Sequence, residues 1–177
     1  GSVCLDLSAG VGGNSFELGK AFDSVHAFEL DQERCKMLRS NLKHHGVDSV
    51  VTCTCGDSVQ ALRNKLPGNG PGSVGNERLS TAVAAILDPP WGGTHYNTSK
   101  QRETIRFSGL TMSELVVEFV GMNKSLRVLG IKLPLSFDVT GDLADKLSGA
   151  AGVRMYACKN IFRQRFVVFV AAKSPAD

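Results

Sequence analysis

Short apolar runs alternate along this chain of 177 residues with stretches that carry apolar residues at helical spacing. Seven runs have the length and the flanking turn residues of strands. These runs are 3–8, 25–30, 50–55, 82–87, 127–133, 153–158 and 165–172. Helical spacing predicts helices over 14–22, from Asp31 to Gly46, and over 58–66, 112–126 and 140–147. Asp31 and Thr111 are predicted to cap two of these helices.

Strands that alternate with helices predict β-α-β units, in which helices cover both faces of a parallel sheet. The last two runs have no room between them for a crossover helix, so they are expected to pair antiparallel. The predicted fold is therefore α/β: a Rossmann-like, mostly parallel sheet of seven strands, closed by one antiparallel strand. The chain length predicts a single domain over 1–177. Residues 68–76 and 92–109 are predicted to be loops.

Composition narrows the choice of protein class. Hydrophobic residues make up 42% of the chain and charged residues 21%, which argues against disorder. The net charge of +3 is compatible with a nucleic-acid partner without requiring one. No apolar run reaches the length of a membrane span. The chain opens on Gly-Ser without Met, which is typical of a cloning scar, so we expect a piece of a longer protein.

Five cysteines are scattered along the sequence at spacings that match no zinc site. They are Cys4, Cys35, Cys53, Cys55 and Cys158. Small buried side chains are the simplest interpretation of the pair in the third strand. We therefore predict reduced thiols and no bound metal.

A glycine-rich loop follows the first strand and runs Asp-Leu-Ser-Ala-Gly-Val-Gly-Gly-Asn over 6–14. Gly10 and Gly12 let the backbone approach a ligand closely, and Glu29 ends the second strand, where an acid can bind ribose hydroxyls. Ser15 stands where a dinucleotide fingerprint requires Gly or Ala. A carboxylate at Asp6 would repel a pyrophosphate but would attract an ammonium or a sulfonium. The pattern therefore favours S-adenosylmethionine over a dinucleotide.

Asp57 and Ser58 follow the third strand, where an acid or a hydroxyl can accept a hydrogen bond from an adenine amino group. Alone, this pair would also be typical of a helix cap. Because acids stand at the ends of successive strands, we interpret Asp57 and Ser58 as further cofactor-binding residues.

The sequence Asp-Pro-Pro-Trp-Gly-Gly at 88–93 follows the fourth strand. Pro89 and Pro90 restrict the backbone and remove two N–H donors, so the turn is stiff and presents carbonyl acceptors. Asp88 and these carbonyls can accept both hydrogens of an exocyclic amine and so direct its lone pair at a methyl donor. Trp91, the only tryptophan, can stack on a base, most strongly on a cationic one. The alternative is a core tryptophan beside a structural turn.

These two motifs, with Tyr96 after the second, closely resemble the trimethylguanosine synthase family of cap guanine 2-amino methyltransferases. The resemblance covers essentially the whole chain and is strongest over 3–14, 29–31, 55–58 and 88–96. It implies a class I methyltransferase domain that transfers a methyl from S-adenosylmethionine to a 7-methylguanosine cap, to give di- and trimethylguanosine. It also implies a monomer that acts on capped RNA of the snRNA or snoRNA type in the nucleus, with the cytoplasm as a second location.

The resemblance further assigns roles to single residues. Those matching its cofactor site are Asp6, Gly10, Gly12, Asn14, Glu29 and Asp57. Those matching its catalytic turn are Asp88, Pro89 and Pro90, with Trp91 stacked on 7-methylguanine. It implies that Asn41 contacts the methylated base and that Tyr96 lies near the cap phosphates.

Two features depart from the family. Leu135 stands after Leu-Pro, where the family has a phosphate-binding Arg. Lys100, Arg102 or Arg106 could supply phosphate contacts instead, although solvated loop charges have the same appearance. A helical segment that precedes the first strand in the family is absent, so we expect weak cofactor binding and turnover. Two alternatives stay open: an amino methyltransferase for guanine or adenine of rRNA or DNA, and a cap-binding module without catalysis.

Overall fold

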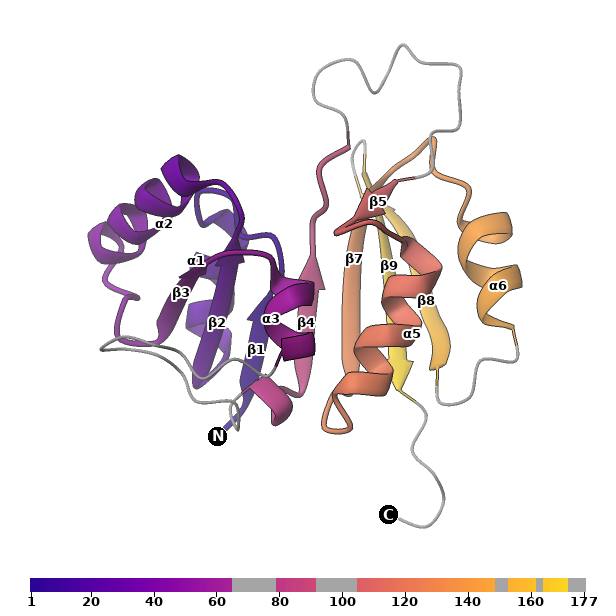
Figure 1. The fold of residues 1–177 in the computed structure, drawn as a ribbon, viewed down its shortest axis with the longest axis horizontal. Helices are drawn as coiled ribbons and strands as arrows, with labels where there is room; N and C mark the ends of the chain where they lie inside the picture. Colours follow the sequence, from indigo (N-terminus) through magenta and orange to yellow (C-terminus); the bar gives the residue numbers. More distant parts are fainter. Residues whose placement is uncertain (65–78, 92–104, 149–152, 162–163, 172–177) are drawn as a thin grey trace.

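A computed structural model of the chain describes residues 1–64, 79–91, 105–148, 153–161 and 164–171. Within these residues seven strands form one sheet in the order β3-β2-β1-β4-β7-β9-β8 (Figure 1). Their bounds are β1 Val3–Asp6, β2 Ser24–Glu29, β3 Val51–Cys55, β4 Ala84–Leu87, β7 Val128–Pro134, β8 Val153–Ile161 and β9 Gln164–Ala171. Strands β3, β2, β1, β4 and β7 pair in parallel, and β9 runs antiparallel to both of its neighbours. The predicted mostly parallel sheet with one antiparallel strand is confirmed.

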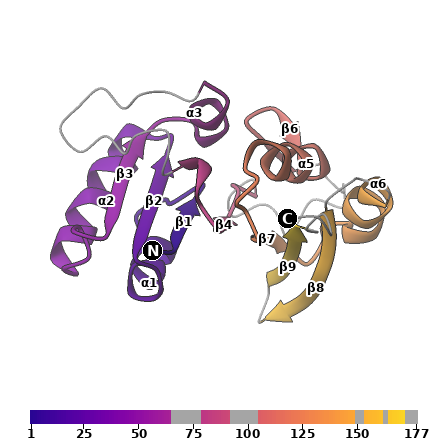
Figure 2. The ribbon, with the colours of Figure 1, turned by 90° about the horizontal axis from the view of Figure 1, so that it is seen from below.

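Helices cover both faces of this sheet. Their bounds are α1 Gly13–Ala21, α2 Gln32–His44, α3 Ser58–Asn64, α5 Met112–Met122, the π-helix η2 Val139–Ala144 and α6 Asp145–Leu147. Figure 2 shows α3 and α5 on one side of the sheet and α1 on the other. In the described part of the chain, none of these helices has the length and apolar character needed to cross a lipid bilayer.

Alternation of side chains along each strand divides the core into two clusters. Leu5 packs with Phe119 of α5, whereas Cys4, its neighbour in β1, packs with Leu38 of α2. All four side chains are at most 1% exposed. Burial of this kind is the main favourable contribution to folding, and it holds the strand ends in place at the edge where they meet.

Two predicted helix caps are present. The Asp31 side chain accepts a hydrogen bond from the Arg34 backbone N–H at 2.8 Å. Thr111 and Glu114 form a reciprocal capping box at the start of α5. The prediction that this helix reaches Leu126 is wrong, because Asn123 leaves the helical conformation and its side-chain amide donates to the carbonyls of two residues before β4.

Two further predictions need correction. Part of the loop predicted over 92–109 is a hairpin, with β5 at Arg106–Phe107 and β6 at Leu110–Thr111. Ser108 and Gly109 both have positive φ, which matches the two-residue turns that join antiparallel strands. The α-helix predicted over 140–147 begins as the π-helix η2, where Gly141 donates its N–H to the Asp138 side chain at 3.1 Å.

Candidate functional site

The carboxyl ends of β1, β2, β3 and β4 meet at one edge of the sheet, because these strands run parallel. A cavity of about 400 Å³ lies at this edge, within the size range of small-molecule sites. It is lined by Leu7, Ser8, Ala9, Gly10, Glu29, Leu30, Arg34, Gly56, Asp57, Ser58, Asp88, Pro90, Arg106, Phe107 and Ser108. These residues come from segments far apart in the sequence. The chain order of the strands reverses between β1 and β4, which is where ligands bind in open α/β sheets.

The loop between β1 and α1 contains two glycines in conformations that other residues rarely adopt. Gly10 has φ +57 and Gly12 has φ +107. A Cβ atom at Gly12 would lie 2.9 Å from the Leu38 Cδ1 atom, so Gly12 allows the loop to pack against α2. Of the predicted loop residues, Gly10 lines the cavity, whereas Gly12 and Asn14 lie outside its lining.

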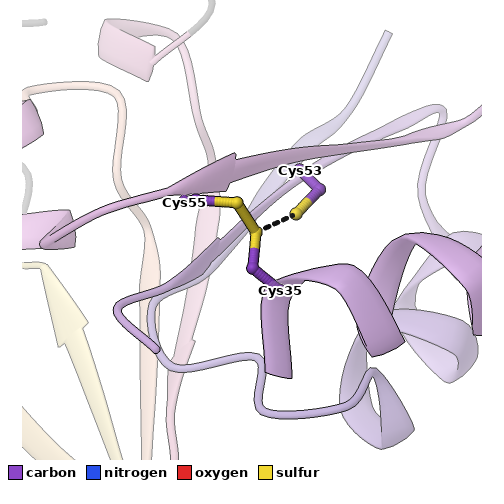
Figure 3. A group of neighbouring side chains, drawn as sticks. All are labelled: Cys35, Cys53 and Cys55. Atoms are coloured by element: carbon purple, nitrogen blue, oxygen red, sulfur yellow. Dashed lines mark hydrogen bonds between the residues drawn. A yellow bond between two sulfur atoms is a disulfide. The ribbon is translucent and has the colours of Figure 1, made fainter. Parts of the chain in front are cut away.

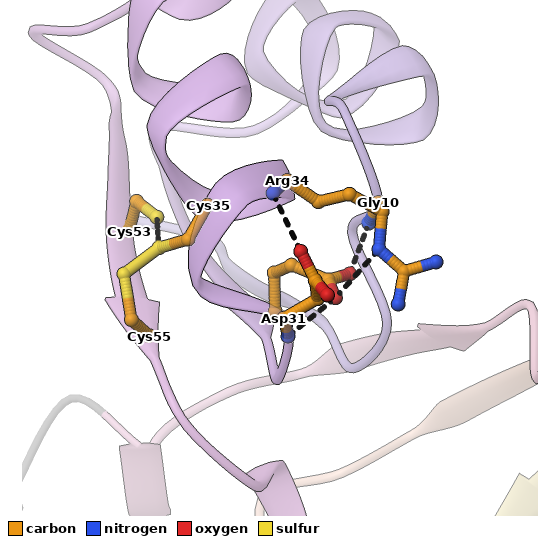
Figure 4. A network of polar contacts seen from close by, with 7 residues as sticks. Gly10, Asp31, Arg34, Cys35, Cys53 and Cys55 are labelled. Carbon is orange, nitrogen blue, oxygen red and sulfur yellow. Dashed lines mark hydrogen bonds and ion pairs between the residues drawn. A yellow bond between two sulfur atoms is a disulfide. The ribbon is translucent and has the colours of Figure 1, made fainter.

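Glu29 at the end of β2 is held by donors from both sides. One carboxylate oxygen accepts the Gly10 N–H and the other accepts the Asp31 N–H, each at 2.8 Å. Arg34 pairs with the same carboxylate at 3.2 Å, although its own side chain is 56% exposed. Figure 4 shows Gly10, Asp31 and Arg34 gathered at the start of α2. Glu29 is thus a buried, oriented acid at the cavity wall.

Asp6 lies below the loop rather than in the cavity wall. Its carboxylate is fully buried, and one oxygen accepts the Ser15 hydroxyl hydrogen at 2.6 Å. The other oxygen has no hydrogen-bond partner among the described residues. Burial raises the pKa of Asp6 to about 6, and the negative charges of Asp88 and Glu29 add to this effect. The ends of three adjacent strands therefore form a negatively charged region.

Asp57 and Ser58 both line the cavity. Asp57 also caps α3, because one of its oxygens accepts the Gln60 N–H at 3.0 Å. Its other oxygen accepts the hydroxyl of Ser108 from the β5–β6 hairpin. Ser58 is buried and donates to the Leu7 carbonyl at 2.9 Å. Asp57 and Ser58 can therefore serve the start of α3 and still be available to a ligand in the cavity.

The Asp-Pro-Pro-Trp turn closes the cavity on the side of β4. Asp88 donates its N–H to the Ser8 hydroxyl oxygen, and its carboxylate accepts from the Lys132 ammonium at 2.7 Å. Trp91 donates its ring N–H to the Lys132 carbonyl at 3.2 Å. Asp88 and Pro90 line the cavity, whereas Pro89 and Trp91 lie outside its lining. Pro89 is buried beneath the turn.

The remaining predicted contacts are only partly within the described residues. Asn41 lies near the end of α2 and donates to the Val11 carbonyl at 2.8 Å, so it ties the glycine loop to this helix and lies outside the cavity lining. Arg106 lines the cavity and donates to the Gly109 carbonyl. The predictions for Tyr96, Lys100 and Arg102 lie outside the described residues.

Several site residues were missed by sequence reasoning. Arg34 and Lys132 pair with the two predicted acids Glu29 and Asp88. Ser108 reaches the cavity from the hairpin that the sequence analysis assigned to a loop. The sequence offered a sign of Lys132, because this charged residue interrupts an otherwise apolar strand over 128–134. Nothing in the sequence pointed to Arg34, because a charged residue in the first turn of an amphipathic helix is ordinary.

Three of the cysteines lie together between α2 and β3 (Figure 3). Cys35 and Cys55 form a disulfide, and the Cys53 sulfur lies 3.4 Å from that of Cys35. The prediction of reduced thiols is therefore wrong for Cys35 and Cys55, because packing of α2 on β3 joins residues that are 20 apart in the sequence. Three sulfur atoms are one fewer than a structural zinc site requires. The absence of a metal stays a prediction.

The carboxylates in and beneath the cavity fit S-adenosylmethionine better than a dinucleotide. Two buried acids, Asp6 and Glu29, with a third at Asp88, give a negative environment that suits a sulfonium and an ammonium and repels phosphates. Glu29 and Asp57 present acceptors at the ends of neighbouring strands, where ribose and adenine groups can donate.

Solved structures share this fold at low sequence identity, among them two whose titles name a methylase or a methyltransferase. An rRNA methylase from Streptococcus thermophilus superposes with a TM-score of 0.59 at 14% identity, covering 97% of this chain and 87% of that one. A precorrin-6y methyltransferase from Geobacter metallireducens gives 0.62 at 17% identity, covering 98% and 80%. A conserved hypothetical protein from Streptococcus pyogenes gives 0.65 at 14% identity, covering 96% and 86%.

Sequence comparison is more specific. An uncharacterised protein of Acanthamoeba polyphaga mimivirus is 30% identical over 138 residues, which span 77% of this chain and 47% of that protein. The chain thus matches less than half the length of this relative. The family model described as RNA cap guanine-N2 methyltransferase matches residues 1–165. Because this match covers most of the chain, it shows that the chain belongs to the RNA cap guanine-N2 methyltransferase family.

Proposed function

We propose that the chain methylates the 2-amino group of 7-methylguanosine at an RNA cap and gives di- and trimethylguanosine caps. One observation carries this proposal: Asp88 and Pro90 line the same cavity as Gly10, Glu29 and Asp57. The turn that can hold an exocyclic amine therefore borders the site suited to the cofactor. The match to the family model over 1–165 supports the cap as substrate.

The cofactor would lie between the glycine loop and the ends of β2 and β3. Glu29 would accept from the ribose hydroxyls, since its exposed partner Arg34 can be displaced. Asp57 and Ser58 would face the adenine. Asp6 would act from below the loop through its charge. S-adenosylmethionine, when bound, supplies an electrophilic methyl group.

The Asp-Pro-Pro-Trp turn would orient the acceptor amine. Its lone pair is delocalised into the base, so the amine is a weak nucleophile and gains from orientation. Asp88 would accept one N–H hydrogen, and the carbonyl of Pro89 or Pro90 would accept the other. As the nitrogen becomes positively charged, the Asp88 carboxylate stabilises it and then accepts its proton.

Trp91 would select the cap. A tryptophan ring binds a cationic base by stacking and by cation–π attraction, and 7-methylguanine carries a positive charge. Tyr96 and Asn41 stay candidates for cap contacts by resemblance, and Arg106 for a phosphate contact because it lies exposed at the cavity. Capped RNA of the snRNA or snoRNA type, a monomeric state and a nuclear location complete the proposal and rest on the same resemblance.

A second candidate is methylation of an uncharged guanine or adenine in rRNA or DNA. One observation favours it: the Lys132 ammonium lies 5.9 Å from the centre of the Trp91 ring. A cation close to the ring opposes the stacking of a cationic base, and the ion pair of Lys132 with Asp88 weakens this opposition.

Trp91 provides the test, because it is the only tryptophan and its fluorescence reports on one site. Titration with 7-methylguanosine triphosphate is expected to quench the emission strongly, and guanosine triphosphate much less. Methyl transfer is measured in parallel with a 7-methylguanosine cap analogue, an unmethylated cap analogue and uncapped RNA. Trp91→Phe is expected to retain part of the activity, whereas Trp91→Ala loses about 1–3 kcal/mol of cap affinity.

Equal quenching by both nucleotides, with transfer to uncapped RNA, would replace the cap proposal by the second candidate. A core role of Trp91 would appear differently. Trp91→Ala would then lower the free energy of unfolding by about 3–5 kcal/mol and abolish binding of S-adenosylhomocysteine together with that of the cap.

A further inference from the structure

We propose that Lys132 is a positioning residue for methyl transfer, holding Asp88 and Trp91 in a defined arrangement across the catalytic turn. This inference rests on the function proposed above and adds to it a residue from a strand that follows the turn by 44 positions.

Lys132 contacts both ends of the turn. Its ammonium donates to one carboxylate oxygen of Asp88 at 2.7 Å and lies 5.9 Å from the centre of the Trp91 ring. Its backbone carbonyl accepts the ring N–H of Trp91 at 3.2 Å. A single residue of β7 therefore orients the acid by its side chain and the aromatic ring by its main chain.

Strand pairing explains why this position is suited to the role. β4 and β7 pair in parallel with Leu87 opposite Ile131, so Asp88 and Lys132 follow at corresponding places. Ile131 and Leu133, on either side of Lys132, are at most 1% exposed, and their side chains point to the other face of the sheet. The strand is thus anchored by its apolar residues, and Lys132 projects from a rigid base.

The partial burial of the ion pair makes its geometry well defined. The side chains of Lys132 and Asp88 are 20% and 25% exposed, so neither is fully solvated. A half-buried charge is unfavourable without its partner, which keeps the two groups together. The Asp88 N–H is held separately by the Ser8 hydroxyl at 2.8 Å. The backbone and the carboxylate of Asp88 are therefore each restrained by a different strand end.

For catalysis, the consequence is that the two oxygens of the Asp88 carboxylate have different roles. Lys132 occupies one oxygen, and within the described part of the chain the other is left for an amine hydrogen. A displacement of about 1 Å in such a contact can lower a rate about 100-fold. The charge has a separate effect, because removal of the ammonium leaves Asp88 uncompensated and more attractive to a cationic base. The turnover number should therefore fall without a rise in the KM for the cap.

The test compares Lys132→Met and Lys132→Arg with the wild-type chain, with Lys124→Met as a matched control at an exposed lysine outside the cavity lining. Methyl transfer to a 7-methylguanosine cap analogue, S-adenosylhomocysteine affinity and Trp91 emission are measured for each. Lys132→Met is expected to lower kcat 10- to 100-fold, with the KM for the cap unchanged or lower and cofactor affinity within threefold. Lys132→Arg should recover most of the rate. Trp91 emission should change in Lys132→Met and stay constant in Lys124→Met.

An unchanged kcat in Lys132→Met overturns the proposal. So does a joint loss of rate, cofactor affinity and unfolding temperature that arginine does not restore, because that result describes a purely structural residue. Failure of the wild-type chain to methylate any cap analogue would refute the proposed function instead. In that case Trp91 emission still tests whether Lys132 positions the turn. An identical spectrum in Lys132→Met would show that the ammonium does not influence it.

Discussion

The two halves of the cavity are built by different means. At the ends of β1 and β2, Asp6 and Glu29 are nearly inaccessible. They accept hydrogen bonds from Gly10, Ser15 and Asp31, which lie at most 19 positions away in the sequence. At β4 and β7, the contacts join Asp88 and Lys132 across 44 residues of sequence, and both side chains are partly exposed.

The halves also differ in charge. The first holds two buried carboxylates whose only cationic partner among the described residues, Arg34, is mostly exposed, so it attracts a cationic ligand. In the second, Lys132 neutralises Asp88, so recognition there depends on orientation and stacking. Under the proposed function, the first half supplies cofactor affinity and the second supplies the reaction. The following experiments test that division.

Under the proposed function, Asp88→Asn should have the largest effect, because it removes the negative charge that would stabilise the reacting amine and accept its proton, and that pairs with Lys132. We expect kcat to fall about 10²- to 10⁴-fold. Isothermal calorimetry should show a smaller change in S-adenosylhomocysteine affinity than Glu29→Gln produces. If cofactor affinity fell as far as the rate, the two halves would not be separable.

Asp6→Asn should change how stability depends on pH. Burial raises the pKa of Asp6 to about 6, above its ordinary value of 3.8, so the ionised form destabilises the fold. This destabilisation is fully present above pH 6 and disappears as the pH falls below about 4. The free energy of unfolding of Asp6→Asn relative to wild type should therefore decrease by roughly 2 kcal/mol from pH 7 to pH 4.

Urea unfolding at several pH values measures this difference. Burial lowers the pKa of His26 to about 4, but this residue titrates in both proteins and cancels from the comparison. A stability difference that stays constant between pH 4 and pH 7 would show that the pKa of Asp6 is not raised. The description of the first half as a region of buried negative charge would then be wrong.

Glu29→Gln should weaken S-adenosylhomocysteine binding about 10- to 150-fold, because a hydrogen bond to a charged group contributes about 1.5–3 kcal/mol. Glu33→Gln is the matched control, since Glu33 lies on the same helix turn as Arg34 but is exposed and pairs with Lys36. Equal affinities in the two variants would remove Glu29 from the proposed cofactor site, whereas a loss of affinity with kcat unchanged at saturating cofactor would confine its role to binding.

Much of the fold could be predicted because it depends on local patterns. Runs of apolar residues of strand length, the caps at Asp31 and Thr111, and the missing crossover before β9 determine the sheet and its one antiparallel strand. The errors occurred where local patterns were weak, as at the two-residue turn of Ser108 and Gly109, or where tertiary contact ended a helix, as at Asn123.

For the site, the sequence by itself determined the acids, the glycines and the Asp-Pro-Pro-Trp turn, because parallel strands bring their carboxyl ends to one edge whatever the details of packing. Only the tertiary structure decided the partners. Lys132 meets Asp88 through the register of β4 and β7, and Cys35 meets Cys55 through the packing of α2 on β3. Such pairings depend on the distances between elements, and no spacing along the chain encodes them.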